Sequence, residues 1–197
     1  MTSIRRGSRE REVAVELDGR PWRTLPVLAV ADARLAVGVT VDRPRARALA
    51  RALRTVRVFD QAVGIVERQE RSRAQVERRL AQRGIRGDDV RQAVTRLASI
   101  GGVDDERFAR GRAALLAGRS YGDAAIADDL ARAGIDPERV RAALATLRPE
   151  AERAETAVTA RGCSVRTIRY LAARGFAEDS IERFMPETAH VEPEADP

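Results

Sequence analysis

The spacing of the hydrophobic positions changes at about residue 43. Before that point, hydrophobic and polar residues alternate in short runs, which is typical of half-buried strands. After it, leucine or valine recurs every three to four residues among arginines and alanines, as on one face of a helix, and proline and glycine fall at the breaks. The pattern predicts a mainly α fold with a small β-rich N-terminal extension.

The N-terminal extension is predicted to contain a β-hairpin. Residues 13–17 alternate between valine or leucine and other residue types, and Asp18-Gly19 supplies the turn, because glycine accepts the positive φ of a tight two-residue loop. The return strand is expected to carry Trp22 and Leu25. Since a hairpin alone is marginally stable, we also expect a third short strand at residues 37–42 and a packed short helix within residues 26–36.

An internal repeat organises the helical part. The segments 72–97 and 121–147 match at an offset of 50 residues. The matched pairs are Val76 and Ile126, Leu80 and Leu130, Gly84 and Gly134, Ile85 and Ile135, Val90 and Val140, Ala93 and Ala143, and Leu97 and Leu147. A weaker third copy, offset by 41 from the second, contains Leu171, Gly175, Phe176, Ile181 and Phe184.

Each copy predicts two helices joined at its glycine, where left-handed φ ends the first helix. Ser72 with Gln75 resembles a capping box, and Asp136 with Pro137 can begin a helix. A further helix precedes each pair, at about residues 54–69, 104–117 and 150–161. Tandem three-helix units are therefore expected to form an elongated, curved stack. The expected segments are 1–42, the extension; 43–100, the first unit with its lead-in helix; 101–148 and 149–186, the second and third units; and 187–197, a disordered acidic tail.

The charge is unevenly distributed. All 36 basic residues are arginine. Residues 1–100 carry 22 arginines against 12 acidic residues, whereas residues 101–197 carry 14 against 18. A basic half of this kind can approach phosphates or an acidic surface.

The acidic run Asp104-Asp105-Glu106 is the first candidate for chemistry. Its position after a glycine pair and before Phe108 indicates a helix start, with Asp104 as the cap and the next two acids in the first turn, where the helix dipole favours negative charge. A metal or acid–base role and a partner contact are the alternatives to this interpretation.

Other signals of catalysis are missing from the sequence. Cys163 and His190 are the only cysteine and histidine, which are too few for a zinc site, and a chain without lysine has no phosphate-binding P-loop. The glycine patterns of a nucleophile elbow and of a dinucleotide-binding fold do not occur either. We therefore expect no enzyme activity, no metal and no cofactor, although an unrecognised carboxylate pair stays as an alternative.

Three stretches resemble the RecX regulatory proteins, which modulate the RecA recombinase: RSRAQVERRLAQRGI, VDDERFAR and SYGDAAIADDLARAGI. The resemblance covers about residues 55–185. It implies tandem three-helix units, binding to RecA and to its filament on single-stranded DNA, and suppression of the ATPase, strand-exchange and coprotease activities, in DNA repair, homologous recombination and the SOS response. This chain departs from the family in using arginine alone.

We predict that exposed arginines make the partner contacts. The candidates are Arg68, Arg71, Arg73, Arg78, Arg79, Arg83, Arg107, Arg110 and Arg119. A solvated helix face is the alternative interpretation of these arginines. A helical DNA-binding protein that acts without RecA is the alternative function, and weak direct DNA binding is compatible with either. We expect a cytoplasmic protein without a membrane span, because no long apolar run and no secretory signal is present. A monomer is the simplest interpretation of its oligomeric state.

Overall fold

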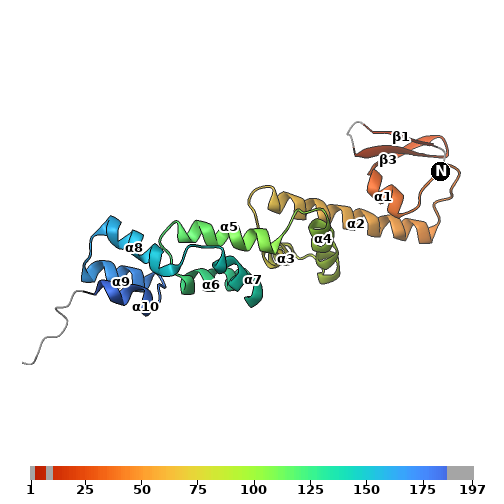
Figure 1. Ribbon diagram of the computed structural model, residues 1–197. Coiled ribbons are helices and arrows are strands. Elements are labelled where there is room, and N and C mark those ends of the chain that lie inside the picture. Colours follow the sequence, from red (N-terminus) through yellow and green to blue (C-terminus); the bar gives the residue numbers. More distant parts are fainter. Residues whose placement is uncertain (1–2, 8–10, 186–197) are drawn as a thin grey trace, which may run out of the picture. The chain divides into compact units, whose positions relative to one another are not determined.

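The computed structural model describes residues 3–7 and 11–185, which form a mainly helical chain with one small sheet (Figure 1). The chain divides into two compact units. The first contains residues up to 70 together with 76–103, and the second contains residues 71–75 together with those from 104 onward. The predicted acidic tail at 187–197, with His190, lies outside the described residues.

The sheet of the first unit is antiparallel, with strand order β1-β2-β3. Its strands are β1 (Ser3–Arg6), β2 (Glu12–Leu17) and β3 (Arg20–Pro26). The predicted turn is confirmed, since Asp18 and Gly19 both have positive φ, of 50° and 77°. The predicted third strand is wrong: residues 37–42 form no strand, and the third strand is β1, which pairs with β2. The β-branched residues at 37–42 find no neighbouring strand to bond with, so their local preference for strand is not realised.

Two helices complete the N-terminal part. α1 (Val27–Asp32) confirms the predicted short helix, and α2 (Arg43–Val66) is one uninterrupted helix of 24 residues. Asp42 caps α2 by accepting from the Arg45 amide at 2.9 Å, and a proline occupies the first turn, where its missing N–H is not needed. α1 lies between the sheet and α2 (Figure 1).

The buried face of α2 changes halfway along the helix. Leu49, Ala52 and Val56 pack with the sheet and α1, whereas Val58 and the residues after it pack with the first helical repeat. Because successive residues turn by about 100°, the two buried faces are nearly opposite. One helix therefore serves both the N-terminal extension and the first repeat.

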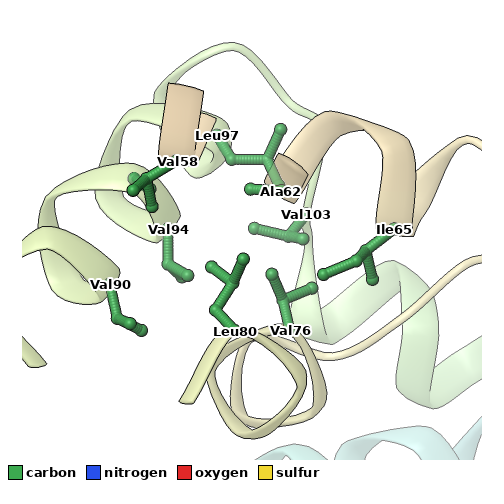
Figure 2. Packing of buried hydrophobic residues seen from close by; sticks show 10 residues of the cluster. Val58, Ala62, Ile65, Val76, Leu80, Val90, Val94, Leu97 and Val103 are labelled. Carbon is green, nitrogen blue, oxygen red and sulfur yellow. The ribbon is translucent and has the colours of Figure 1, made fainter. Parts of the chain in front are cut away.

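The first repeat adds α3 (Arg73–Gln82) and α4 (Gly87–Ser99) to the second half of α2. Figure 2 shows Val76 and Leu80 of α3 pointing into a cluster with Val94 and Leu97 of α4. All four side chains are almost completely buried. This cluster confirms the hydrophobic positions that defined the repeat.

The other two repeats lie in the second unit. The second contains α5 (Asp105–Ala117), α6 (Asp123–Arg132) and α7 (Pro137–Ala145). The third contains α8 (Glu150–Arg161), α9 (Val165–Ala173), the short α10 (Glu178–Ile181) and a 3-10 turn, η1 (Glu182–Phe184). Each repeat has its own hydrophobic cluster, with Leu130 and Leu171 at the centres of the second and third.

The glycine corners share one geometry. Gly84, Gly134 and Gly175 have φ of 74°, 83° and 78°. In each corner the residue after the glycine donates its amide to the carbonyl of the leucine five residues earlier, and the glycine amide donates to the next carbonyl. This pair of hydrogen bonds defines the Schellman motif, which requires left-handed φ at the glycine. The predicted internal repeat is thus confirmed by backbone geometry.

Candidate functional site

Four of the predicted contact arginines lie in the first unit: Arg68 in the turn after α2, Arg78 and Arg79 on α3, and Arg83 in the turn after α3. All four are exposed. Arg78 and Arg79 point to different sides of α3, because neighbouring positions differ by about 100°. Arg79 and Arg83 follow the same edge, and Nη1 of Arg83 donates to Oε1 of Gln61 on α2 at 3.2 Å. Helical spacing therefore places Arg79 and Arg83, four residues apart, on one side and Arg78 on another.

The other five predicted arginines belong to the second unit, at Arg71, Arg73, Arg107, Arg110 and Arg119. Arg71 is half-buried, and the others are exposed. Arg110 forms an ion pair with Glu106 one turn earlier on α5. The main chains of Arg73 and Arg119 bond to other residues of the unit, so for these two the backbone has a structural role while the guanidinium faces solvent.

The acidic run begins a helix, as predicted. Asp104 is the N-cap of α5, and its Oδ1 accepts from the amides of Glu106 and Arg107 at 2.9 and 3.0 Å. These bonds, first of all the one from Arg107, hold the pKa of Asp104 below its usual range. Asp105 has a further contact that the sequence does not reveal: its Oδ1 accepts from the Arg73 amide at 2.8 Å.

The same contact recurs at the start of the third repeat. Glu150, the first residue of α8, accepts from the Asp123 amide through Oε1 at 2.6 Å, as Asp105 accepts from the Arg73 amide. Its other oxygen accepts from the Ala177 amide at 3.0 Å and from the Ser180 hydroxyl at 2.9 Å. One carboxylate thus satisfies amides at the beginnings of α6 and α10, which would otherwise lack partners.

A buried guanidinium also links the second repeat to the third. The Arg153 side chain donates to the carbonyls of Arg148 at 3.0 Å and Tyr121 at 2.8 Å and forms an ion pair with Asp123. Burial raises the pKa of Asp123, and the nearby charge of Glu150 acts in the same direction, while Arg153 opposes it. Every hydrogen bond of Arg153 stays within the second and third repeats, so its role is structural.

Close backbone packing accompanies the polar contacts. The Gly122 amide donates to the Arg174 carbonyl at 2.9 Å, and a side chain at Gly122 would overlap the backbone of Gly175 and Phe176. The position equivalent to Gly122 in the first repeat is Ser72, whose hydroxyl donates to the Ala133 carbonyl at 2.5 Å and accepts from the Gln75 amide at 3.2 Å. The Ser72 amide in turn donates to Oε1 of Gln75 at 3.4 Å, so the predicted capping box is present.

Arginine and tyrosine side chains also pack against each other in alternation where the second and third repeats meet. The guanidinium of Arg161 lies 4.0 Å from the ring centre of Tyr170, and that of Arg174 lies 5.0 Å from Tyr170 and 4.3 Å from Tyr121. Arg174 also donates to the Arg119 carbonyl at 3.0 Å. Cation–π contacts of this kind stabilise the packing of the third repeat on the second.

Two further carboxylates of the second unit are paired. Arg112 of α5 binds both oxygens of Asp129 on α6 at 2.8 Å, which lowers the pKa of Asp129. Asp136 caps α7, and its bonds to the Arg139 amide and then to the Arg139 side chain hold its pKa below the usual range. Asp129 thus links α6 to α5, whereas the bonds of Asp136 stay within the first turn of α7.

The structure places an additional set of arginines that we did not predict as contacts. Residues 43–59 of α2 contain six arginines and no acidic residue. Five of them are exposed, and four of these five follow one face of the first half of the helix: Arg43, Arg47, Arg51 and Arg54. The absence of acids was visible in the sequence, but the common face became clear only once the buried side of α2 was known.

Clusters of metal-binding side chains and surface grooves are the features that would indicate a site for chemistry. Among residues 3–7 and 11–185, no group of three or more His, Cys, Asp or Glu side chains is placed to hold a metal ion. A groove of about 720 Å³ in the second unit is lined by small residues with Arg148, Arg153 and Arg161, and its lining contains no carboxylate or imidazole. Within the described part of the chain, no helix is both long and apolar enough to cross a membrane.

Sequence comparisons identify related proteins. A family model described as the first three-helix domain of RecX matches residues 59–97. Regulatory protein RecX of Xanthomonas oryzae pv. oryzae (strain MAFF 311018) is 41% identical over 85 residues, which cover 43% of this chain and 53% of that protein, so the match spans about half of that relative's length. Regulatory protein RecX of Stenotrophomonas maltophilia (strain R551-3) is 32% identical over 132 residues, which cover 62% of this chain and 81% of that protein.

Two solved structures share the fold. The crystal structure of a regulatory protein RecX superposes with a TM-score of 0.80 at 19% identity and covers 93% of this chain and 97% of that chain. The structure of RecX from Lactobacillus salivarius gives a TM-score of 0.57 at 21% identity and covers 66% of this chain and 94% of that one. At these identities the structures support the fold alone.

Proposed function

The chain belongs to the RecX family of regulatory proteins, and we propose that it binds the RecA recombinase and its filament on single-stranded DNA and inhibits the filament's ATPase, strand-exchange and coprotease activities. The observation that carries the proposal is the match to a RecX protein over most of that protein's length. The proposed role is that of a non-enzymatic cytoplasmic monomer, whose partner is RecA and whose effect comes from binding.

The exposed arginines support a binding role. Arg68, Arg78, Arg79 and Arg83 are exposed in the first unit, and a guanidinium presents a planar fork that suits carboxylates and phosphates alike. Contacts of this kind are individually weak at a surface. Several of them on one chain can add up when the partner is a polymer with repeated sites.

A titration of RecA with the chain tests the proposal. DNA-dependent ATP hydrolysis by RecA is followed while the chain is added. We expect hydrolysis to fall as the chain is added. A loss at amounts well below that of RecA indicates action on filament growth or ends, and a loss only at nearly equal amounts indicates occupancy along the filament. An unchanged rate at an excess of the chain would contradict the proposal.

A charge-reversal variant tests whether the arginines of α3 and of the turn after it contact RecA or its filament. Replacing Arg78, Arg79 and Arg83 by glutamate should shift the inhibition curve to higher concentrations without unfolding the chain. The matched control replaces Arg141, Arg166 and Arg169, which are exposed on α7 and α9, and should leave the curve in place. Equal curves for the first variant and the wild type would remove these arginines from the contact surface.

The alternative function, DNA binding without RecA, gives a different result. A protein of that kind would hold DNA equally well with and without the recombinase, and its affinity would fall steeply with salt. A filament regulator should instead associate far more tightly when RecA covers the DNA. Comparing the two affinities at one salt concentration separates the candidates.

A further inference from the structure

We propose that four arginines on the N-terminal half of α2 form a contact surface for the sugar–phosphate backbone of duplex DNA. The surface, called the α2 stripe, consists of Arg43, Arg47, Arg51 and Arg54. The spacings of four, four and three residues keep the side chains on one face of the helix. At a rise of about 1.5 Å per residue the stripe is about 17 Å long.

The α2 stripe lies on the side of α2 that the N-terminal extension leaves uncovered. Leu49, Ala52 and Val56 point toward the sheet and α1, and the helical spacing places the stripe on the opposite face. All four arginines are exposed in the first unit. The stripe is therefore accessible from solvent along its whole length within this unit.

No side chain of the stripe is paired with an acidic residue of the described chain. Among the described residues, none of its four side chains forms a hydrogen bond or an ion pair, whereas the neighbouring Arg45 is paired with Asp42 at 3.2 Å. Like charges four residues apart on a helix repel each other, and positive charge near a helix N-terminus opposes the helix dipole. The arrangement is unfavourable in the isolated chain, and a polyanion laid along α2 would relieve it.

The chemistry of the stripe favours a duplex over a single strand. A row of guanidiniums along one helix can contact phosphates without reading base sequence. Binding of single strands relies on aromatic side chains on which bases stack, and no aromatic residue lies on α2 before Phe59, whose ring lies under Arg96. Duplex DNA carries one charge per about 1.7 Å of axis, so about ten phosphates lie along the length of the stripe.

Two carboxylates border one end of the stripe. Asp32 and Asp89 line a groove together with Arg51 and Arg54, and neither is ion-paired with them. Their charge should weaken the approach of phosphate at this end. Asp32 stands at the end of α1, where negative charge is unfavourable to the helix, so Asp32→Asn should tighten duplex binding without loss of stability.

The proposed contact with duplex DNA is measured in the absence of RecA. It therefore stands or falls independently of the proposed inhibition of RecA. The full chain is titrated into a fluorescein-labelled duplex, and anisotropy gives the affinity at several salt concentrations. For four phosphate contacts the slope of log affinity against log salt should be about −3.6, which is roughly a 150-fold loss between 50 and 200 mM. Replacing the four stripe arginines by glutamine should remove most of that slope.

A matched variant separates the stripe from net charge. Replacing Arg141, Arg148, Arg166 and Arg169 of the second unit by glutamine removes the same charge from exposed positions. We expect this control to keep nearly the wild-type slope, with both variants folded as judged by circular dichroism. Equal losses in the two variants, an unchanged slope in the stripe variant, or tighter binding of a single strand than of the duplex would overturn the proposal.

Discussion

Replacing Gly122 by alanine perturbs a close backbone approach between the second and third repeats. The added Cβ would overlap the carbonyl of Gly175 and the amide of Phe176. Because both are backbone groups, rotation of a side chain cannot relieve the overlap. The start of α6 and the Gly175 corner must move apart, and the bond from the Gly122 amide to the Arg174 carbonyl, 2.9 Å long, weakens.

The expected loss of stability follows from these two effects. Overpacking of a closely fitted site costs about 1–3 kcal/mol, and a weakened hydrogen bond adds about 0.5–1.5 kcal/mol. The lower flexibility of alanine in the unfolded chain offsets about 0.4–1 kcal/mol. We therefore expect Gly122→Ala to lower the free energy of unfolding by about 2–3 kcal/mol.

Urea unfolding followed by circular dichroism measures the effect, and Gly64→Ala is the matched control. Gly64 lies inside α2, and a Cβ there meets nothing within 4 Å. Alanine should raise the stability of α2 by about 0.5–1 kcal/mol, since it is the better helix former. The reasoning is refuted if Gly122→Ala is as stable as the wild type, or if the two variants change stability in the same direction.

Three further variants, one of them with a matched control, test the other contacts of the second unit. Glu150→Ala should lower the free energy of unfolding by about 2–4 kcal/mol in urea titrations, because three donors lose a partially buried carboxylate; a loss below 1 kcal/mol would contradict this role. Ser72→Ala should cost about 2–3 kcal/mol, since it removes a cap and leaves the Ala133 carbonyl unpaired. Ser164→Ala removes a cap and a bond to the Thr167 hydroxyl, which keeps its bond to the Gly162 carbonyl, so it should cost about 1 kcal/mol. Equal losses in the two variants would show that the bond to Ala133 contributes nothing. Asp104 has a lowered pKa, so its contribution to stability is fully present above the ordinary value of 3.8 and is lost as pH falls below that value through the lowered pKa of the folded state. Asp104→Asn keeps a capping oxygen but cannot titrate, so its stability measured between pH 6 and 2 should fall less steeply than that of the wild type, and an identical slope would rule the linkage out.

Local and periodic signals predicted much of the fold. The offset of 50 residues identified Val76, Ile126, Leu80 and Leu130 as buried positions, and all four are fully buried. The hairpin turn and the helix caps were predicted equally well, because a glycine, a proline or a capping side chain acts within a few residues. The acidic run beginning at Asp104 was also correctly interpreted as a helix start.

Contacts between distant residues were not predictable in this way. The strand at residues 3–6 forms because it pairs with β2, and nothing in its own pattern distinguishes it from residues 37–42. Asp105 and Glu150 look like ordinary first-turn acids, and their amide partners lie 32 and 27 residues away. The α2 stripe required knowledge of which face of α2 is buried, and that face changes along the helix.

The most direct test of the proposed function is the affinity of the labelled chain for single-stranded DNA with and without RecA. Anisotropy or interferometry at one salt concentration measures both states with the same DNA. We predict at least a tenfold tighter association with the RecA-coated strand, about 1.4 kcal/mol in binding free energy. Equal affinities in the two states would contradict a regulator that recognises the recombinase filament.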